Sequence, residues 1–435
     1  MGNLKIYPVK LSGEIKIPPS KSMAHRAVIC AALGDGISKV TNIDYSDDII
    51  ATINAMSSLG TKITKRKDYL EVYGINSPEN IEANSVKDER TIDCNESGST
   101  LRFLVPIAAL FEGVNRFVGR GNLGKRPLDT YYKIFDEQGI KYSYKEGILD
   151  LKTEGKLKAG EFKMEGNISS QFITGLLFTL PLLDGDSKII ITTEMESKGY
   201  IDLTLSTIKD FGVEIINNNY EEFIIKGNQI YKSIDYRVEG DYSQAAFFFC
   251  ADALSNYIVL NDLKLDSLQG DKEVIDILER MELKLSSENN GLIGRISNSL
   301  KSTVIDSSQC PDIIPVVSLV AALSEGTTEI INAGRLRIKE CDRLAAVTSE
   351  LNKLGAKITE KEGGLIIEGV KELKGNAEVW SHKDHRIAMT IAIASTMCKE
   401  PIILKDYECV SKSYPQFWDD FKNLGGVFDE WNLGE

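Results

Sequence analysis

Histidine is scarce in this chain of 435 residues, which has only three of them, and its seven cysteines are scattered without a Cys-x-x-Cys pair. A metal site built from several histidines is therefore not expected. An odd and dispersed set of cysteines in a chain of this length indicates reduced thiols rather than a disulfide framework or a zinc site. The sequence predicts no bound metal and no redox cofactor.

Long apolar runs are also missing. The most apolar stretch, residues 172–183, is about a dozen residues long and too short to span a bilayer. The amino-terminal segment MGNLKIYPVKLSGEIKIPPS has no apolar core of a secretory signal. Ile6 stands where a myristoylation motif would place Ser or Thr. We expect a cytoplasmic protein that does not bind membranes.

Positive charge is in the minority, since 51 Lys and Arg stand against 64 Asp and Glu, for a net charge of -13. This balance argues against a nucleic-acid-binding protein, which usually has a basic surface. It does not exclude anionic substrates, because a local cluster of Arg and Lys can outweigh a distant acidic surface.

The length of the chain exceeds that of one compact core and suggests two or three domains.

The chain is built from internal repeats. Six segments run from a short alternating strand through a polar cluster into an apolar helix rich in small residues, and their starts recur at intervals of roughly 65 to 80 residues. They are EIKIPPSKSMAHRAVICAALGDG, TIDCNESGSTLRFLVPIAALFEG, FKMEGNISSQFITGLLFTLPLLDG, YRVEGDYSQAAFFFCADAL, TVIDSSQCPDIIPVVSLVAALSEG and VWSHKDHRIAMTIAIASTM.

The second half of each repeat is also similar. A strand and a polar turn lead into an amphipathic helix, which usually ends at a glycine suited to the left-handed conformation. These glycines are Gly60, Gly139, Gly212, Gly355 and Gly425, and Glu282 takes the place in the fourth repeat. A hairpin-like pair of strands follows most of them. Each repeat therefore reads β-α-β-α-β-β.

Six such repeats divide naturally into two similar domains of three repeats each. The first helix of each repeat is apolar nearly all round and should be buried, whereas the second is amphipathic and should face the surface. The fold class is α/β or α+β, and periodicity alone does not choose between them.

Polar and basic residues gather at the junctions between strands and helices. The free N–H groups and the positive end of the dipole make a helix amino terminus a ready anion site. Taken singly, each Ser, Asp or Asn reads as an ordinary N-cap, each Arg or Lys as solvated surface charge, and His385 as a structural histidine. These readings explain poorly why basic residues stand at the same place in most repeats. The planar guanidinium of Arg matches phosphate or carboxylate, so several converging Arg side chains indicate a doubly anionic ligand.

The ordered motifs PPSKSMAHRA, SGSTLR, KRP, ISSQF, CPDIIP, RIKECDRL, DHR and SKSYPQF resemble those of the 5-enolpyruvylshikimate-3-phosphate synthase family over essentially the whole chain. The resemblance implies two domains around an inter-domain active-site cleft. It implies that residues 1–19 and 235–435 form a first, discontinuous domain and that residues 20–234 form the second. It also implies no cofactor, a monomer, the substrates phosphoenolpyruvate and shikimate 3-phosphate, and inhibition by glyphosate.

The resemblance also implies roles for individual residues. Asp312 would accept the proton of the attacking hydroxyl, Glu340 would exchange protons with the enol carbon, and Lys21 would be the third catalytic group. The phosphoenolpyruvate ligands would be Lys21, Gly98, Arg126, Gln171, Arg343, Arg386 and Lys412. The shikimate 3-phosphate ligands would be Lys21, Ser22, Arg26, Ser169, Ser170, Gln171, Ser197, Asp312 and Lys339. Arg102 and His385 would have supporting roles.

Three positions depart from the family pattern: Glu96 replaces a common Asn, Ser99 a common Thr, and Arg335 an amide that binds shikimate 3-phosphate. We therefore leave Arg335 out of the predicted site. Two alternatives stay open. A sister enzyme transfers enolpyruvyl to a UDP-sugar, but its pattern has Lys-Asn and a loop cysteine, whereas this chain has Lys21-Ser22 and the loop GRGNLGKRP. A non-catalytic repeat scaffold that binds anions is the other.

Overall fold

The computed structural model describes residues 2–78, 89–289, 291–296 and 299–431. The chain divides into two compact units. Unit 1 consists of Met1–Pro18 together with Gly240–Glu435, and unit 2 consists of Pro19–Glu239. Each unit has its own apolar core.

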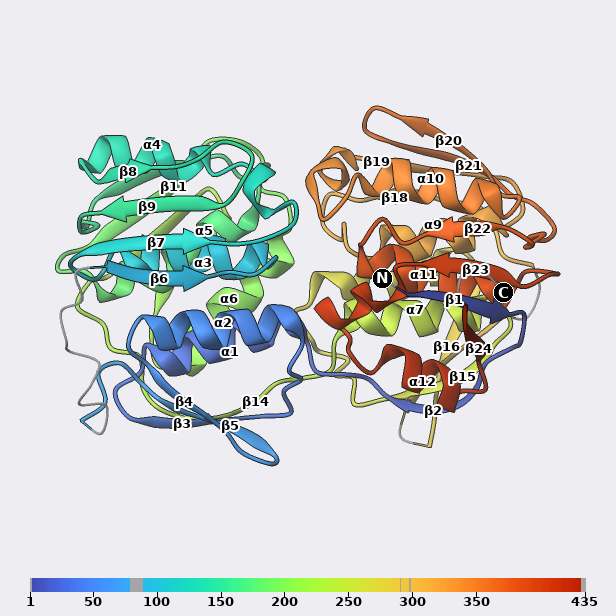
Figure 1. Cartoon of the computed structure of the whole chain (residues 1–435), viewed down its shortest axis with the longest axis horizontal. Helices are drawn as coiled ribbons and strands as arrows, with labels where there is room; N and C mark the ends of the chain where they lie inside the picture. Colours follow the sequence, from blue (N-terminus) through green and yellow to red (C-terminus); the bar gives the residue numbers. More distant parts are fainter. Residues whose placement is uncertain (1, 79–88, 290, 297–298, 432–435) are drawn as a thin grey trace. The chain divides into compact units, whose positions relative to one another are not determined.

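Unit 2 contains three four-stranded sheets and six α-helices in its described part (Figure 1). Its elements are α1 (Lys21–Ala32), β3 (Ile37–Thr41), α2 (Asp47–Ser58), β4 (Lys62–Lys65), β5 (Tyr69–Tyr73), β6 (Glu89–Asp93), α3 (Gly98–Ala108), β7 (Val114–Val118), η2 (Leu123–Lys125), α4 (Asp129–Gln138), β8 (Lys141–Ser143), β9 (Asp150–Glu154), β10 (Glu161–Met164), α5 (Ser170–Thr179), η3 (Leu180–Leu182), β11 (Ser187–Ile191), α6 (Lys198–Asp210), β12 (Ile215–Asn218), β13 (Glu222–Ile225) and β14 (Asp235–Arg237).

Unit 1 repeats the arrangement, again with three four-stranded sheets and six α-helices among its described residues. Its elements are β1 (Asn3–Tyr7), β2 (Ser12–Lys16), α7 (Tyr242–Ala253), β15 (Tyr257–Asn261), η4 (Gly270–Lys272), α8 (Glu273–Arg280), β16 (Leu283–Glu288), β17 (Gly291–Ile296), β18 (Val304–Asp306), α9 (Ile314–Ala322), β19 (Thr327–Ile331), η5 (Gly334–Ile338), α10 (Arg343–Lys353), β20 (Lys357–Lys361), β21 (Gly364–Glu368), β22 (Glu378–Trp380), α11 (His385–Ser395), β23 (Ile402–Lys405), η6 (Tyr407–Lys412), α12 (Phe417–Asn423) and β24 (Val427–Trp431).

The sheets follow one pattern, which the sheet β6-β7-β9-β8 illustrates. Its first two strands are parallel and are joined by α3, whereas β7 with β9 and β8 with β9 are antiparallel pairs. The predicted β-α-β-α-β-β repeat is therefore confirmed. Parallel and antiparallel pairing within one sheet makes the fold a mixed α/β fold, which resolves the choice that periodicity left open.

The strands at the two crossings between units are exchanged. β2 directly precedes α1 in the chain, but it pairs in parallel with β15 of unit 1. β14 directly precedes α7, but it pairs in parallel with β3 of unit 2. In the last sheet of unit 1, β1 lies between β23 and β24 and is antiparallel to both. The first and fourth repeats of the sequence thus each give their first strand to the other unit.

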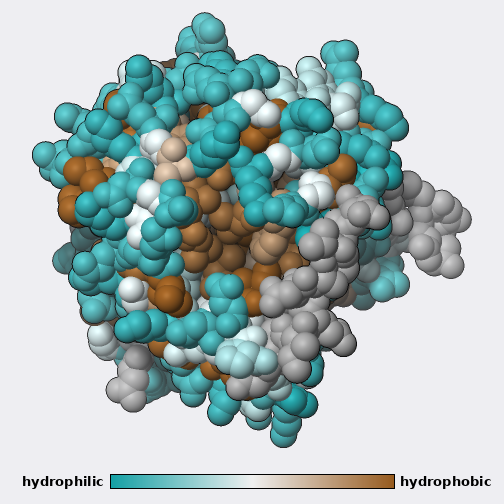
Figure 2. Space-filling model, turned by 90° about the vertical axis from the view of Figure 1, so that its left-hand side faces the viewer, coloured by the Kyte–Doolittle hydropathy of each residue, from teal (hydrophilic) through white to brown (hydrophobic). Residues whose placement is uncertain are grey.

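The helices occupy the predicted environments. All residues of α7, α9 and α11 are buried, whereas only three residues of the amphipathic α4 are. The predicted burial of the first helices is therefore confirmed. The view of unit 2 in Figure 2 shows an apolar hollow ringed by hydrophilic residues, so apolar side chains also reach the surface on this face.

The helix ends also follow the sequence pattern. The five predicted glycines have positive φ angles between 70° and 106°. Glu282 adopts the same conformation with φ 80°, although it has a side chain. The left-handed helix end is therefore a property of the repeat, which the fourth copy keeps without glycine.

Candidate functional site

Arg343 is the centre of the candidate site in unit 1. It is the first residue of α10, and its side chain is only 2% exposed. Its guanidinium donates to three carboxylates, from Nη1 to Asp312 Oδ1 at 2.8 Å, from Nη2 to Glu340 Oε2 at 2.9 Å and from Nε to Asp384 Oδ2 at 2.8 Å. Burial alone lowers the pKa of this guanidinium, but the three carboxylates hold it well above its usual value. One fork thus fixes the positions of both predicted acid–base groups.

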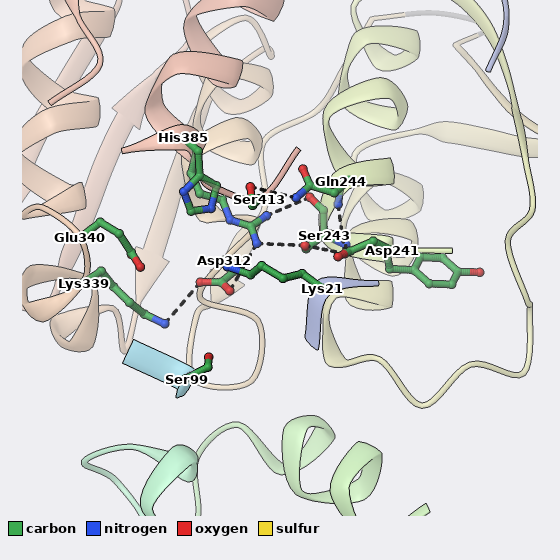
Figure 3. Close-up of polar contacts among 12 residues, drawn as sticks. Lys21, Ser99, Asp241, Ser243, Gln244, Asp312, Lys339, Glu340, His385 and Ser413 are labelled. Carbon is green, nitrogen blue, oxygen red and sulfur yellow. Dashed lines mark hydrogen bonds and ion pairs between the residues drawn. The ribbon is translucent and has the colours of Figure 1, made fainter. Parts of the chain in front are cut away.

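Asp312 lies just before α9, where three cations surround its carboxylate. Besides Arg343, Lys339 Nζ lies 3.3 Å from Oδ1 and Arg386 Nη2 lies 3.5 Å from Oδ2. In Figure 3, Lys339 reaches toward the carboxylate of Asp312. Burial raises the pKa of Asp312, but Lys339, Arg386 and Arg343 outweigh it and hold the pKa well below the usual value. The carboxylate is ionised, and its basicity depends on how strongly these cations are neutralised by other anions.

Arg386 is supported by a residue of the fourth repeat. Its guanidinium donates from Nη1 to the carbonyl oxygen of Ser243 at 3.0 Å and from Nη2 to Ser243 Oγ at 2.9 Å. Ser243 Oγ in turn donates to Asp241 Oδ1 at 2.6 Å, and Asp241 caps α7 (Figure 3). None of the residues predicted from the sequence lies in this repeat, although Asp241 directly before an apolar helix has the same N-cap pattern as predicted residues in other repeats.

Three further residues of unit 1 that the motifs name, Lys412, His385 and Arg335, lie in or at the ends of helices. Lys412 is the last residue of η6 and is 8% exposed. His385, the first residue of α11, is buried with Nδ1 3.8 Å from Asp384 Oδ1. Arg335 donates from Nη2 to the Ser308 carbonyl oxygen at 2.8 Å.

In unit 2, Lys21 is the first residue of α1, after the N-cap Ser20. Its Nζ lies 2.9 Å from Oδ2 of Asp48, which is in the first turn of α2. Both side chains are largely buried, so this ion pair is well shielded from solvent. Asp48 was not a candidate in the sequence analysis, because its partner lies 27 residues away along the chain.

Arg26 lies one turn further along α1 and is 3% exposed. It donates from Nε to Thr204 Oγ1 at 2.9 Å, from Nη1 to the Ser22 carbonyl at 2.6 Å and from Nη2 to the Tyr200 carbonyl at 2.9 Å. All three acceptors are neutral, and among the described residues no carboxylate forms an ion pair with Arg26. Burial lowers the pKa of Arg26 to about 10, because the charge is desolvated without a nearby anion.

Gly98, Arg126 and Gln171 are brought together at the start of α3. Gly98 is the first residue of the helix, and a Cβ added to it would lie 2.2 Å from Arg126 Nη1 and 3.8 Å from Gln171 Oε1. Gln171 Nε2 donates to Ser99 Oγ at 2.9 Å, and its Oε1 accepts from Arg102 Nη1 at 2.8 Å. Because a guanidinium only donates, Arg102 fixes which way the Gln171 amide faces.

The predicted serines of unit 2 lie at helix starts. Ser169 caps α5, where its Oγ accepts from the Gln171 N–H, and Ser170 is the first residue of that helix. Ser197 precedes α6 with φ 57°, an unfavourable conformation for a serine and one that is common at functional sites.

A buried chain of hydroxyl groups links the first three helices of unit 2. His25 Nδ1 lies 2.7 Å from Thr52 Oγ1, which lies 2.7 Å from Thr100 Oγ1. Thr100 Oγ1 donates to Oγ of Ser97, the N-cap of α3, at 2.8 Å. Burial lowers the pKa of His25 to about 3, so the imidazole is neutral at ordinary pH. This chain connects α1 to the helix start that presents Gly98.

Neither a metal centre nor a membrane segment stands out in the described ranges. Over residues 2–78, 89–289, 291–296 and 299–431, no three His, Cys, Asp or Glu side chains are grouped so as to hold a metal ion. In the same part of the chain, no helix has both the length and the apolar character needed to cross a bilayer.

Comparisons with known proteins agree on one family. The profile of the family described as EPSP synthase (3-phosphoshikimate 1-carboxyvinyltransferase) matches residues 7–421. A relative from Clostridium beijerinckii with the name 3-phosphoshikimate 1-carboxyvinyltransferase is 92% identical, with all of both chains covered. One of the same name from Clostridioides difficile is 69% identical, again over 100% of both chains.

Solved structures show the same fold at lower identity. The EPSP synthase of Acinetobacter baumannii has a TM-score of 0.82 at 24% identity, with 99% of this chain and 100% of that chain covered. The enolpyruvyl transferase NikO of Streptomyces tendae has a TM-score of 0.81 at 15% identity, with 99% of each chain covered. From the profile and the closely similar relatives, we conclude that this chain belongs to the EPSP synthase family.

Proposed function

We propose that this protein transfers the enolpyruvyl group of phosphoenolpyruvate to the 5-hydroxyl of shikimate 3-phosphate and releases phosphate, a step of aromatic amino-acid biosynthesis. Family membership supports the reaction. The observation that carries the assignment of catalytic groups is the guanidinium of Arg343, which holds Asp312 and Glu340 at 2.8 and 2.9 Å. The reaction needs two such groups, one for the hydroxyl proton and one for the carbon proton.

The proposed steps use these two carboxyl groups in turn. Glu340 gives a proton to the methylene carbon of phosphoenolpyruvate, and the neighbouring carbon becomes cationic. The 5-hydroxyl oxygen bonds to that carbon, and Asp312 takes the hydroxyl proton. From the resulting tetrahedral intermediate, Glu340 takes back a proton from the methyl carbon while the C–O bond to phosphate breaks. The double bond is restored and Glu340 is protonated again. The proton on Asp312 passes to the departing phosphate, which leaves as hydrogen phosphate, so both carboxyl groups return to their starting states.

The cations around Asp312 make proton uptake by this carboxylate dependent on substrate binding. With Lys339, Arg386 and Arg343 close by, the carboxylate is a weak base. Substrate phosphate and carboxylate groups would neutralise part of this positive charge and raise the pKa of Asp312 toward that of a useful base. The same cations then stabilise phosphate as it leaves.

We assign the ligand-binding roles as the family resemblance implies. Phosphoenolpyruvate would be bound by Lys21, Gly98, Arg126, Gln171, Arg343, Arg386 and Lys412. Shikimate 3-phosphate would be bound by Lys21, Ser22, Arg26, Ser169, Ser170, Gln171, Ser197, Asp312 and Lys339. The uncompensated charge of Arg26 supports a role in binding an anion, because its described contacts are all to neutral acceptors.

We also propose that the enzyme works as a monomer in the cytoplasm without a cofactor. Its seven cysteines are all free thiols, as is usual in a reducing compartment. Light scattering after size-exclusion chromatography tests the monomer, and a dimer mass at micromolar concentration would contradict it.

Phosphate release tests the reaction. The purified protein is given phosphoenolpyruvate with shikimate 3-phosphate, with a UDP-N-acetyl sugar or with no acceptor, each with and without a chelator. We expect phosphate only with shikimate 3-phosphate and at the same rate with the chelator. Turnover with the UDP-sugar would support the sister reaction instead, and binding without turnover would support a non-catalytic scaffold.

A further inference from the structure

Glu350 is a buried carboxylate outside the site described above, and it makes an unusual number of contacts. It lies in α10, seven residues after Arg343, and its side chain is 2% exposed. Its Oε2 accepts from the backbone N–H of Trp380 at 2.9 Å, and its Oε1 lies 2.9 Å from His382 Nε2. Lys353 Nζ donates to both oxygens at 2.7 and 2.9 Å.

These contacts hold a segment whose backbone is unfavourable. Residues 381–383 connect β22 to α11, and both His382 and Lys383 have positive φ angles, of 53° and 57°. Two successive non-glycine residues rarely adopt the left-handed conformation, so surrounding contacts must keep them there. Glu350 provides such contacts on one side of the segment.

Asp406 holds the segment on a second side. Its Oδ2 accepts from Trp380 Nε1 at 2.8 Å, and its carbonyl oxygen accepts from Ser381 Oγ at 3.0 Å. The His382 ring packs on the Trp380 ring with centroids 4.2 Å apart. The segment is therefore fixed by side chains of two other elements.

The segment ends at the residues of the candidate site. Asp384 follows Lys383 directly, caps α11 through the Arg386 N–H at 2.8 Å and accepts from Arg343 Nε at 2.8 Å. Helix α10 therefore contacts this stretch at two points, through Arg343 at its start and through Glu350 two turns later. A shift of residues 381–383 would move Asp384 and, with it, the Arg343 guanidinium and the start of α11, which carries Arg386.

We propose that Glu350 is a positioning residue, which holds residues 380–383 so that Asp384 keeps the Arg343 guanidinium and the α11 start at Arg386 in place for the anionic substrate. This proposal rests on the proposed function, which assigns these two arginines to phosphoenolpyruvate. Glu350 itself does not touch the arginines in any contact of the described residues. Its role is exerted through the backbone at Trp380 and the ring of His382.

The test is Glu350→Gln, which keeps the shape of the side chain but replaces one acceptor oxygen by a donor. We expect the KM for phosphoenolpyruvate to rise about tenfold, while the KM for shikimate 3-phosphate changes less than twofold. Lys353→Met is the matched control, because it removes a partner of Glu350 that does not belong to the segment, and both KM values should stay within twofold. Equal rises in both KM values, or none, in a folded Glu350→Gln protein would overturn the proposal.

His382→Gln provides a second test if Glu350→Gln folds poorly, because His382 is partly exposed. It should raise the KM for phosphoenolpyruvate about threefold. In the double variant the two effects should be less than multiplicative, because both act through one contact, and multiplicative effects would overturn the proposal. Wild-type phosphate release is measured in parallel, so an inactive wild type would count against the proposed function, whereas an active wild type with unaffected variants would count only against Glu350.

Discussion

The two units use buried arginines in opposite ways. Arg343 in unit 1 and Arg26 in unit 2 are about equally buried, at 2% and 3% exposure. Arg343 donates to three carboxylates, whereas Arg26 donates to two carbonyls and a hydroxyl. Their pKa values shift accordingly, since burial lowers that of Arg26 while carboxylates overcome burial and raise that of Arg343.

This difference indicates a division of labour between the units. In unit 1, positive charge is matched by carboxylates, and one guanidinium contacts both Asp312 and Glu340, the groups proposed for proton transfer. In unit 2, the positive charge of Arg26 is held by neutral dipoles, which is consistent with its proposed role in binding an anionic group of the substrate. The predictions below test this contrast.

The largest effect should come from Asp312→Asn and Glu340→Gln. Each keeps the approximate shape of the side chain and removes a proton acceptor, so kcat should fall about 100- to 10,000-fold. Substrate affinity should change far less and is measured separately by calorimetry. Near-normal kcat in either variant would remove that residue from the mechanism, and a loss of binding alone would make Asp312 a ligand only.

The next largest effect is on stability: Arg343→Met should lower the free energy of unfolding much more than Arg26→Met does. Arg343→Met leaves buried Asp384 without its cation and should cost about 3–5 kcal/mol. Arg26→Met leaves no charge behind, and the Tyr200 carbonyl keeps a hydrogen bond from Thr204, so about 1 kcal/mol is expected. Urea unfolding of both variants checks this, and equal losses would refute the contrast between the units.

Gly98→Ala should separate phosphoenolpyruvate from glyphosate. A methyl group there would lie 2.2 Å from Arg126 Nη1, so the guanidinium must move. Glyphosate is longer than phosphoenolpyruvate in this direction and should lose about tenfold more affinity, or about 1.4 kcal/mol. Inhibition is measured against phosphoenolpyruvate in both proteins, and the wild type should be sensitive. Unchanged glyphosate inhibition in the variant would mean that Gly98 does not line the pocket.

His25 should make unit 2 sensitive to acid. Burial lowers its pKa to about 3 in the folded state, whereas the unfolded chain takes up the proton near pH 6.5. The free energy of unfolding is therefore unaffected by protonation of His25 above pH 6.5. It falls as the pH drops below 6.5, by about 1.4 kcal/mol at pH 5.5, because only the unfolded chain binds the proton. His25→Asn should reduce the difference between unfolding free energies at pH 7.5 and 5.5 by that amount. Identical pH dependence of the two proteins would show that His25 does not set it.

The smallest effect is expected for Glu282→Gly. All three amphipathic helices of unit 2 end in a left-handed glycine, whereas unit 1 has Glu282 at φ 80°. Relief of strain of about 1–2 kcal/mol should exceed the entropic cost of glycine of about 0.4–1 kcal/mol. The variant should thus gain roughly 0.5 kcal/mol in thermal unfolding, and Gly355→Ala should lose stability. A loss in both would show that Glu282 makes compensating contacts.

The repeat and the helix starts could be predicted because their signals are local. Asp384 and Ser169 illustrate this, since each precedes an apolar helix and caps it in the structure. Each of these residues is therefore an ordinary N-cap and also part of the candidate site. Two alternatives stayed open at the sequence level, a UDP-sugar transferase and a non-catalytic scaffold. The matching family and the named relatives correspond to neither of them.

The supporting groups could not be predicted because their partners are distant in sequence. Asp48 is 27 residues from Lys21, and Ser243 is 143 residues from Arg386. Only the packing of different repeats brings such pairs together, and no spacing rule relates them. For the same reason the exchange of β2 and β14 between the units is invisible in the repeat alignment.

That exchange has a consequence for how the chain is made on the ribosome. Unit 2 is contiguous, so its three sheets can form as soon as residues 19–239 have emerged. Strands β1 and β2 are synthesised first, but β2 must wait for β15, and β1 must wait for β23 and β24 near the other end. Until then these early strands have unpaired edges, which are sites of aggregation. Unit 1 is therefore expected to fold after unit 2, and its sheet containing β1 to close only after β24 has emerged.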